Sequence, residues 1–283
     1  MANIIRNDIS LYAHNIAIPL TASQSGPQVQ LVPSAYAGTP AFYFEIVGQV
    51  ASGTCTVTLR RSGTTTDDAT ISLTETTKTR KRAVFTNTGT REYFVNLSGG
   101  TTPQVFQARI IVLQDIGASS STTGTAAQFS IQPQQSDNNT SPGTAPNGMW
   151  LFDSSLYDGT LAWTCEVVWS KNGTMQDFTA TLQQDDGSYN FSDLATVVSA
   201  SSAAGPTRST VSFTPTSGRR LGCVFFISNS METYTVHATR IKLAQTGTIT
   251  KTVAPHHILG SLGSSGLQGA RTLWDPAEWG DLL

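Results

Sequence analysis

The chain carries little charge. Asp, Glu, Lys and Arg make up 13% of its 283 residues and the net charge is −2, whereas about 25% of a typical globular protein is charged. The basic surface that attracts nucleic acids and anionic membranes is therefore not expected. Long exposed helices, which normally carry Glu–Lys pairs, are not expected either. The low charge favours a β protein that meets protein neighbours.

Cysteine and long apolar runs are also scarce. The three cysteines, Cys55, Cys165 and Cys223, show no CxxC spacing, and we expect them to be reduced and buried. No run approaches the roughly 18 apolar residues that a membrane span needs. Residues 1–8 lack the apolar run of a signal peptide. We expect a soluble chain, made in a reducing cytoplasm and not inserted in a membrane.

A block of sequence occurs twice. Residues 38–47 align without a gap on residues 159–168. The matched pairs are Thr39 with Thr160, Ala41 with Ala162, Phe42 with Trp163, Glu45 with Glu166 and Val47 with Val168. Further matches join residues 79–86 to 207–214 and residues 109–114 to 240–245. The sequence therefore predicts one β domain written twice.

The spacing between matched residues grows along the chain. It is 121 from Thr39 to Thr160, 128 from Phe85 to Phe213 and 131 from Arg109 to Arg240. We therefore expect insertions in the loops of the second copy, chiefly at residues 185–193 and 200–206. Residues 117–125 have the composition of a flexible linker. The loop-rich residues 132–148 are interpreted as a segment that reaches toward a neighbour.

Apolar residues alternate with polar ones along each copy. Phe42, Phe44 and Ile46 should face one way, with Tyr43, Glu45 and Val47 opposite. We predict two tandem antiparallel β-sandwiches of jelly-roll type, with immunoglobulin-like sandwiches as the alternative. The predicted units are domain 1 at residues 1–118, domain 2 at residues 119–250 and an extended tail at residues 251–283.

The N-terminal lead-in should contain short strands that recur in the second copy. Residues 16–19 are interpreted as an edge strand that corresponds to residues 129–133. Val29 and Leu31 are matched with Met149 and Leu151. The duplication is therefore expected to begin ahead of the block at residue 38.

The tail has no counterpart in the first copy. Asp275, Pro276 and Glu278 predict the start of a short helix. The apolar residues around it are Leu273, Trp274, Trp279 and Leu282. Because such side chains are costly in water, they should pack on the second domain or dock on a partner subunit. Both readings stay open.

Candidate chemical sites are few. Of His14, His237, His256 and His257, none accompanies a GxSxG or HExxH motif, and His237 is expected to fill a structural place matching Phe106. We expect no enzyme activity, no cofactor and no metal site. The acidic pairs Asp67–Asp68 and Asp185–Asp186 are interpreted as solvated turn residues rather than Ca²⁺ ligands.

Two surface features have other interpretations. Trp169, Tyr189 and Phe191 form a candidate platform for stacking a glycan. The basic residues are Arg80, Lys81, Arg82 and Arg91 in the first copy, and Arg208, Arg219 and Arg220 in the second. A nucleic-acid site would need more charge and interleaved aromatics, so we expect ion pairs at the rim of a subunit contact, or solvation.

Over its whole length the chain resembles the accessory virion proteins of tailed bacteriophages. The shared features are low charge, Thr/Ser/Gly-rich β sequence, tandem jelly rolls and extended termini. The resemblance implies a non-enzymatic structural subunit in the virion, in capsid decoration or in the tail, collar or fibre. Its partners would be other virion proteins and copies of itself, with residues 1–30 and 251–283 as clasping arms. The alternative is a carbohydrate-binding jelly roll for attachment to the host surface.

Overall fold

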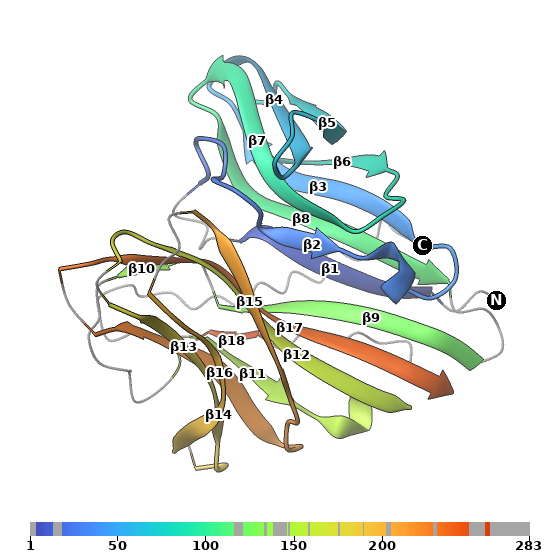
Figure 1. The fold of residues 1–283 in the computed structure, drawn as a ribbon. Helices are drawn as coiled ribbons and strands as arrows, with labels where there is room; N and C mark the ends of the chain where they lie inside the picture. Colours follow the sequence, from blue (N-terminus) through green and yellow to red (C-terminus); the bar gives the residue numbers. More distant parts are fainter. Residues whose placement is uncertain are drawn as a thin grey trace.

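The computed structural model describes residues 4–13, 19–115, 121–132, 135–137, 146, 148–157, 159–174, 176–188, 190–201, 205–228, 231–248 and 258–260. In this part of the chain most regular structure is strand, arranged in four antiparallel sheets (Figure 1). Two short 3-10 helices, η1 (Pro33–Ala35) and η2 (Ser154–Leu156), follow matching strands. Among these residues no helix has the length and apolar character that a membrane crossing requires. The expected all-β sandwich fold is confirmed.

The first sandwich consists of two four-stranded sheets, with the orders β1-β8-β3-β6 and β2-β7-β4-β5. The strands of the first sheet are β1 (Ile4–Ala13), β8 (Gln104–Asp115), β3 (Ala41–Gln49) and β6 (Thr79–Phe85). Those of the second are β2 (Val29–Leu31), β7 (Arg91–Thr101), β4 (Ser52–Arg61) and β5 (Asp67–Leu73). Eight strands divided in this way between two sheets form a jelly roll.

The second sandwich repeats this order. One sheet contains β9 (Ser121–Gln132), β17 (Tyr234–Thr248), β12 (Thr160–Lys171) and β15 (Thr207–Phe213), and β10 (Gln135–Asp137) also pairs with β17. The other contains β11 (Gly148–Phe152), β16 (Arg219–Ile227), β13 (Phe178–Asp185) and β14 (Phe191–Ala200), with β18 (Ile258–Gly260) beside β11. β1 of the first sandwich lies beside β9 of the second (Figure 1).

The strand registers of the two sandwiches also correspond. Phe42 lies opposite Phe85 and Val112, and Trp163 lies opposite Phe213 and Leu243. The pairing of β3 with β8 has a bulge after Val47, with Phe106 as the extra residue. The pairing of β12 with β17 has a bulge after Val168, with His237 as the extra residue. This is the order and register that a duplicated module predicts. The duplication itself stays a prediction, and so do the domain boundaries.

Each sandwich has its own hydrophobic core. Phe42, Phe44 and Ile46 are at most 4% exposed and lie in the first core. The second core is richer in aromatic residues and contains Trp150, Trp163 and Trp169. The alternation read from the sequence is therefore correct, because the residues predicted to face one way are those that the second sheet covers.

The N-terminal expectations need correction. The edge strand that corresponds to β9 is β1, since Ser10 lies opposite Arg109 and Ser130 lies opposite Arg240. Residues 4–13 thus belong to the sheet of their own chain and do not form a free arm. Residues 14–18, which include most of the predicted edge strand, lie outside the described residues. The pattern of β1 was missed because its charged residues obscure the apolar alternation.

The match around β11 is wrong by one residue. Val29 and Leu31 are fully buried, and the buried residues of β11 are Trp150 and Phe152 rather than Met149 and Leu151. The spacing is then 121, as in the block at residue 38. A mostly apolar strand gives no alternation from which the inward face can be chosen.

Two segments interpreted as loops contain strands. Residues 121–125 of the expected linker belong to β9 and pair with β17 between Gln245 and Thr248. In the loop-rich residues 132–148, Gln135–Asp137 form β10 on the same strand. The polar composition of both segments concealed this pairing, because backbone hydrogen bonds do not depend on apolar side chains.

The insertions of the second copy are only partly in loops. The pairing of β13 with β14 has two register shifts, whereas β4 with β5 has one. Residues 191–193 of the expected loop already belong to β14. Part of the added length is therefore taken up as β-bulges.

Candidate functional site

The most strongly charged buried group of the second sandwich surrounds Glu166. This residue lies on β12 and is fully buried on the face opposite the core. Arg240 Nη1 on β17 lies 3.0 Å from Glu166 Oε1, and Arg208 Nε on β15 lies 2.9 Å from Oε2. Lys242 Nζ on β17 also binds Oε2. Three neighbouring strands thus direct cations at one carboxylate, which we call the Glu166 cluster.

The electrostatics of the Glu166 cluster follow from its burial. Burial by itself raises the pKa of Glu166, but the charges of Arg240, Lys242 and Arg208 outweigh this effect and hold the pKa below its ordinary value. Burial lowers the pKa of Lys242, and Glu166 opposes that change. Removing one partner of such a group leaves an uncompensated buried charge, which costs about 3–5 kcal/mol.

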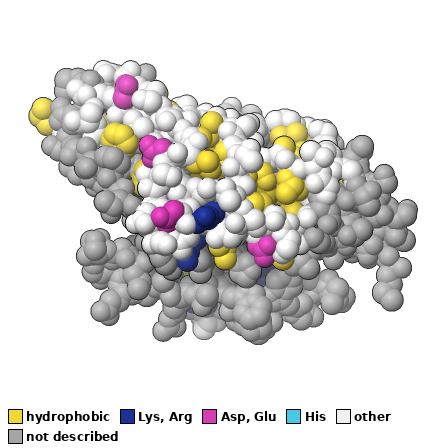
Figure 2. Space-filling view, turned by 90° about the horizontal axis from the view of Figure 1, so that it is seen from below, with side chains coloured by type: hydrophobic (Ala, Val, Ile, Leu, Met, Phe, Trp, Pro, Cys, Tyr) yellow, Lys and Arg dark blue, Asp and Glu magenta, His cyan; other side chains and the backbone are white. Residues whose placement is uncertain are grey.

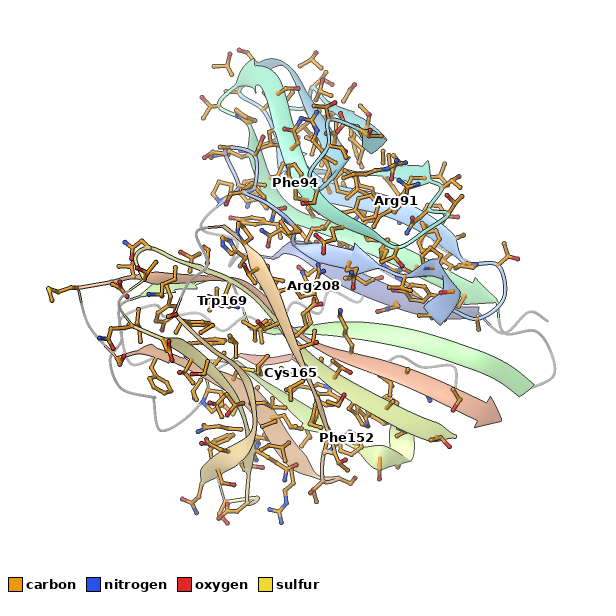
Figure 3. The ribbon with its side chains drawn as sticks, viewed as in Figure 1. Arg91, Phe94, Phe152, Cys165, Trp169 and Arg208 are labelled. Carbon is orange, nitrogen blue, oxygen red and sulfur yellow. The ribbon has the colours of Figure 1, made fainter. Side chains whose placement is uncertain are left out.

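The Glu166 cluster also contacts the first sandwich. Arg208 forms an ion pair with Glu92 of β7. Arg240 Nη2 donates a hydrogen bond of 3.1 Å to the backbone oxygen of Ser10 on β1. Arg208 lies on β15 where this strand passes next to the first sandwich (Figure 3). The cluster therefore binds the two sandwiches together.

A related group lies in the first sandwich at the matched residue Glu45, which is 1% exposed. Arg109 Nε donates to Glu45 Oε1 at 2.7 Å, and Arg82 Nη2 lies 2.7 Å from Oε2. Arg109 also pairs with Asp8 of β1 at 3.1 Å. This Glu45 cluster joins strands β1, β3, β6 and β8 of one sheet of the first sandwich.

A shallow open depression of about 600 Å³ lies on the second sandwich. Aromatic and other apolar side chains line part of it, among them Phe152, Leu161, Trp163, Phe213 and Pro215. Its remaining lining is mostly serine and threonine. Trp163 is only 5% exposed and its ring packs on Trp150, 5.3 Å between centroids. The depression offers apolar contact and hydroxyl groups without a buried charged side chain.

Two of the three residues of the predicted glycan platform, Trp169 and Phe191, lie within the described part of the chain. Trp169 is 1% exposed; its ring stacks on Phe178 at 4.8 Å, and its Nε1 donates to Ser209 Oγ. The alternation along β12 directs Trp169 into the core, so the interpretation of its ring as a surface platform is wrong. Phe191 is half-buried at the start of β14, and Tyr189 lies outside the described residues.

The acidic pairs are mostly paired strand residues rather than solvated turn residues. Asp67 and Asp68 begin β5 and bind Arg60 and Arg61 through two hydrogen bonds each. Asp68 also accepts a hydrogen bond from the Tyr93 hydroxyl at 2.6 Å.

In the second sandwich, Asp185 ends β13 and pairs with Arg220 at 2.7 Å. Asp186 is the turn residue that was expected, since it accepts hydrogen bonds from Ser188 and Asn190. Among the described residues no group of three His, Cys, Asp or Glu side chains could hold a metal ion.

Lys81 and Arg82 of the first copy form ion pairs within the chain. Lys81 lies 2.7 Å from Glu75, and Arg82 binds Glu45. The hydrogen bond from Lys81 lowers the pKa of Glu75 to about 2. In the second copy, Arg208 pairs with Glu166 and Glu92, and Arg220 pairs with Asp185. The expected ion pairs exist, and whether they rim a subunit contact stays a prediction.

His237 is the extra residue of the bulge in β17. Its Nε2 lies 2.8 Å from Ser170 Oγ, and burial lowers its pKa. Among the described residues no carboxylate forms an ion pair with this imidazole. The arrangement orients a serine hydroxyl but supplies no third group to orient the histidine.

The predicted docking residues Leu273, Trp274, Trp279 and Leu282 lie outside the described residues, as does the predicted helix at Asp275. Of the tail, residues 258–260 are described as β18, where Ile258 lies opposite Trp150. The tail therefore adds a strand to the second sandwich.

Comparisons with known proteins give no family. No family model matches the chain, and no curated protein matches its sequence. Several solved structures are similar at low identity. N-glycanase F (PNGase F) is 9% identical with a TM-score of 0.28, covering 91% of this chain and 98% of that one.

Two other solved structures are similar to the chain, again at low sequence identity. The tandem CBM22-1–CBM22-2 domain of Paenibacillus barcinonensis Xyn10C is 12% identical with a TM-score of 0.23, covering 86% of this chain and 92% of that one. The structure of infectious bursal disease virus, Gx strain, is 10% identical with a TM-score of 0.26, covering 86% and 70%. TM-scores this low carry no argument about function.

Proposed function

We propose that the chain is a non-enzymatic structural subunit of a bacteriophage particle that acts through contacts with other virion proteins and with copies of itself. The observation that carries this proposal is the Glu166 cluster, which contacts the other jelly roll through the Arg208–Glu92 ion pair and the hydrogen bond from Arg240 to the Ser10 backbone. A protein whose two domains are held together by such side-chain contacts can transmit force between its neighbours as one unit.

The surface supports the same proposal. On the face seen in Figure 2, most of the described surface is uncharged, with few acidic and basic side chains. Val84 on β6 is 70% exposed and Met231, just ahead of β17, is 77% exposed. A surface with little charge is easier to bury against another subunit, because fewer groups must lose their hydration.

Particle association is the direct test. We expect the chain to co-sediment with purified particles from cells that carry its gene, in a fixed ratio to the major particle proteins. Deleting residues 271–283 should leave the melting temperature unchanged and reduce incorporation, if the tail docks on a partner. Absence of the full-length chain from the particles would contradict the proposal, whereas normal incorporation of the deletion would contradict only the docking role of the tail.

Carbohydrate binding is the second candidate, and the depression at Phe213 is the observation that favours it. Aromatic faces beside hydroxyl groups can bind a sugar ring. A glycan array decides between the two functions, since a structural subunit should give no signal. A signal that Phe213→Ala removes, while Phe191→Ala keeps it, would support the carbohydrate-binding alternative.

A further inference from the structure

Two thiols face each other inside the second sandwich. Cys165 lies on β12 and Cys223 lies on β16, so they belong to the two opposing sheets. Their Sγ atoms are 3.6 Å apart, and neither residue is more than 1% exposed. Cys165 lies at the middle of the sandwich between its layers (Figure 3).

The strands hold both cysteines firmly. Cys165 pairs with Val211 and Ile241 on its two sides, so its strand is central in the sheet. Cys223 pairs with Leu182 on β13. Because backbone pairing fixes both Cα positions, the sulfur atoms meet through the fold and not through a chance side-chain contact.

The first sandwich shows that the fold does not require thiols here. The registers place Phe44 and Val95 where the second sandwich has Cys165 and Cys223, and both are fully buried. Cys55, on β4, is also fully buried, and the sequence offers the first sandwich no second cysteine. Cys55 is therefore an internal control.

We propose that Cys165 and Cys223 form a disulfide that ties the two sheets of the second sandwich together when the chain folds with a low-molecular-weight disulfide as oxidant. The approach needed is about 1.5 Å, since a disulfide bond is about 2.05 Å long. The expectation of three reduced cysteines then describes only the protein kept under reducing conditions.

The reaction is two exchanges. One thiolate attacks oxidised glutathione, which forms a mixed disulfide and releases one reduced glutathione. The second thiolate attacks the protein sulfur of that mixed disulfide, which forms the Cys165–Cys223 bond and releases the second glutathione. In total, two protein thiols are oxidised and one glutathione disulfide is reduced to two thiols.

The exchange should occur during folding rather than afterwards. In the folded chain, the hydrogen bond with Cys223 and burial raise the pKa of Cys165 well above its ordinary value, and the thiolate is the attacking form. Glutathione is also too large to enter the closed core of the folded domain. Once formed, the bond closes a loop between residues 58 apart in sequence, which restricts the unfolded chain.

The test is refolding of the full chain from denaturant into a glutathione redox buffer, followed by alkylation and mass mapping. We expect a loss of two mass units, a peptide link between Cys165 and Cys223, and alkylation of Cys55 alone. The melting temperature should rise by about 5–10 °C relative to the reduced protein.

Two variants and one outcome decide the assignment. Cys55→Ala should still lose two mass units, and Cys223→Ala should not. Refolded wild-type protein that alkylates at all three cysteines across the redox series, or a link that includes Cys55, would overturn the proposal. If Cys223→Ala does not fold, the wild-type map decides by itself. The inference does not depend on the proposed function.

Discussion

The two sandwiches share strand order and register but are filled and joined differently. At the place of Gly48, a side chain would meet the Gln104 backbone oxygen at 2.9 Å, whereas the second sandwich has Trp169 stacked on Phe178. Glu45 binds partners within its own sandwich, and Glu166 belongs to a cluster that reaches the other sandwich. The comparison teaches that strand pairing preserves a fold while core and outer face change independently.

The largest effect should come from the matched aromatic residues. Trp163→Ala and Phe42→Ala each remove a buried ring and should lower the free energy of unfolding by about 4 kcal/mol. Trp163 packs on Trp150, Phe152 and Tyr157, so its loss should be at least as costly as that of Phe42. Denaturant melts measure this. A loss below about 1 kcal/mol for either variant would contradict the equivalence of the two positions.

The next effect concerns the matched glutamates. Glu166→Gln should cost about 3 kcal/mol, because Arg208, Arg240 and Lys242 lose their common anion. The matched control is Glu45→Gln, which should destabilise the first sandwich without loosening its partner. Limited proteolysis between the sandwiches should therefore accelerate in Glu166→Gln only. Equal acceleration in both variants would contradict the joining role of the Glu166 cluster.

A smaller effect should appear with acid. The pKa of Glu166 is lower in the folded chain than in the unfolded chain, so its stabilisation is present above about pH 4.3 and is lost as the pH falls through the folded value. As the pH falls through this window, the melting temperature of the wild-type protein should decrease more steeply than that of Glu166→Gln. Parallel curves would show that Glu166 does not titrate with unfolding.

His237 should affect folding stability at a higher pH than Glu166 does. Its folded pKa is also lowered, so below about pH 6.5 the unfolded chain takes up a proton more readily and folding is disfavoured. Replacement by Gln should flatten the loss of melting temperature between about pH 6.5 and pH 5. A variant curve as steep as that of the wild type would contradict this assignment.

The smallest effect should be that of an exposed pair. Arg60→Ala removes the pair with Asp67, whose side chains are 26% and 25% exposed. Water and ions screen such pairs, so the change in free energy of unfolding should be about 0.5 kcal/mol. A cost comparable to that of Glu166→Gln would show that burial does not set the ranking of the ion pairs.

Much of the fold was accessible from the sequence. The matched blocks at Phe42 and Trp163 gave the central strands and their inward faces, because alternation is strong where one face is covered. β1 and β9 were less accessible, since polar edge strands are held mainly by backbone pairing. Met149 and Trp150 show the limit for apolar strands, where either face can be the buried one.

The candidate site was only partly accessible. The matches of Glu45 with Glu166 and of Arg109 with Arg240 were visible, and antiparallel pairing of their strands would have predicted both ion pairs. The contacts of Arg208 with Glu92 and of Arg240 with Ser10 were not, because they depend on how two sandwiches pack. The approach of Cys165 to Cys223 likewise depends on sheet stacking.

Calorimetric unfolding of the reduced wild-type chain tests the central claim most directly, namely that the contacts of the Glu166 cluster with the first sandwich make two matched jelly rolls one structural body. One transition, with equal calorimetric and van't Hoff enthalpies, is the predicted result. Two separate transitions in the wild type would contradict it.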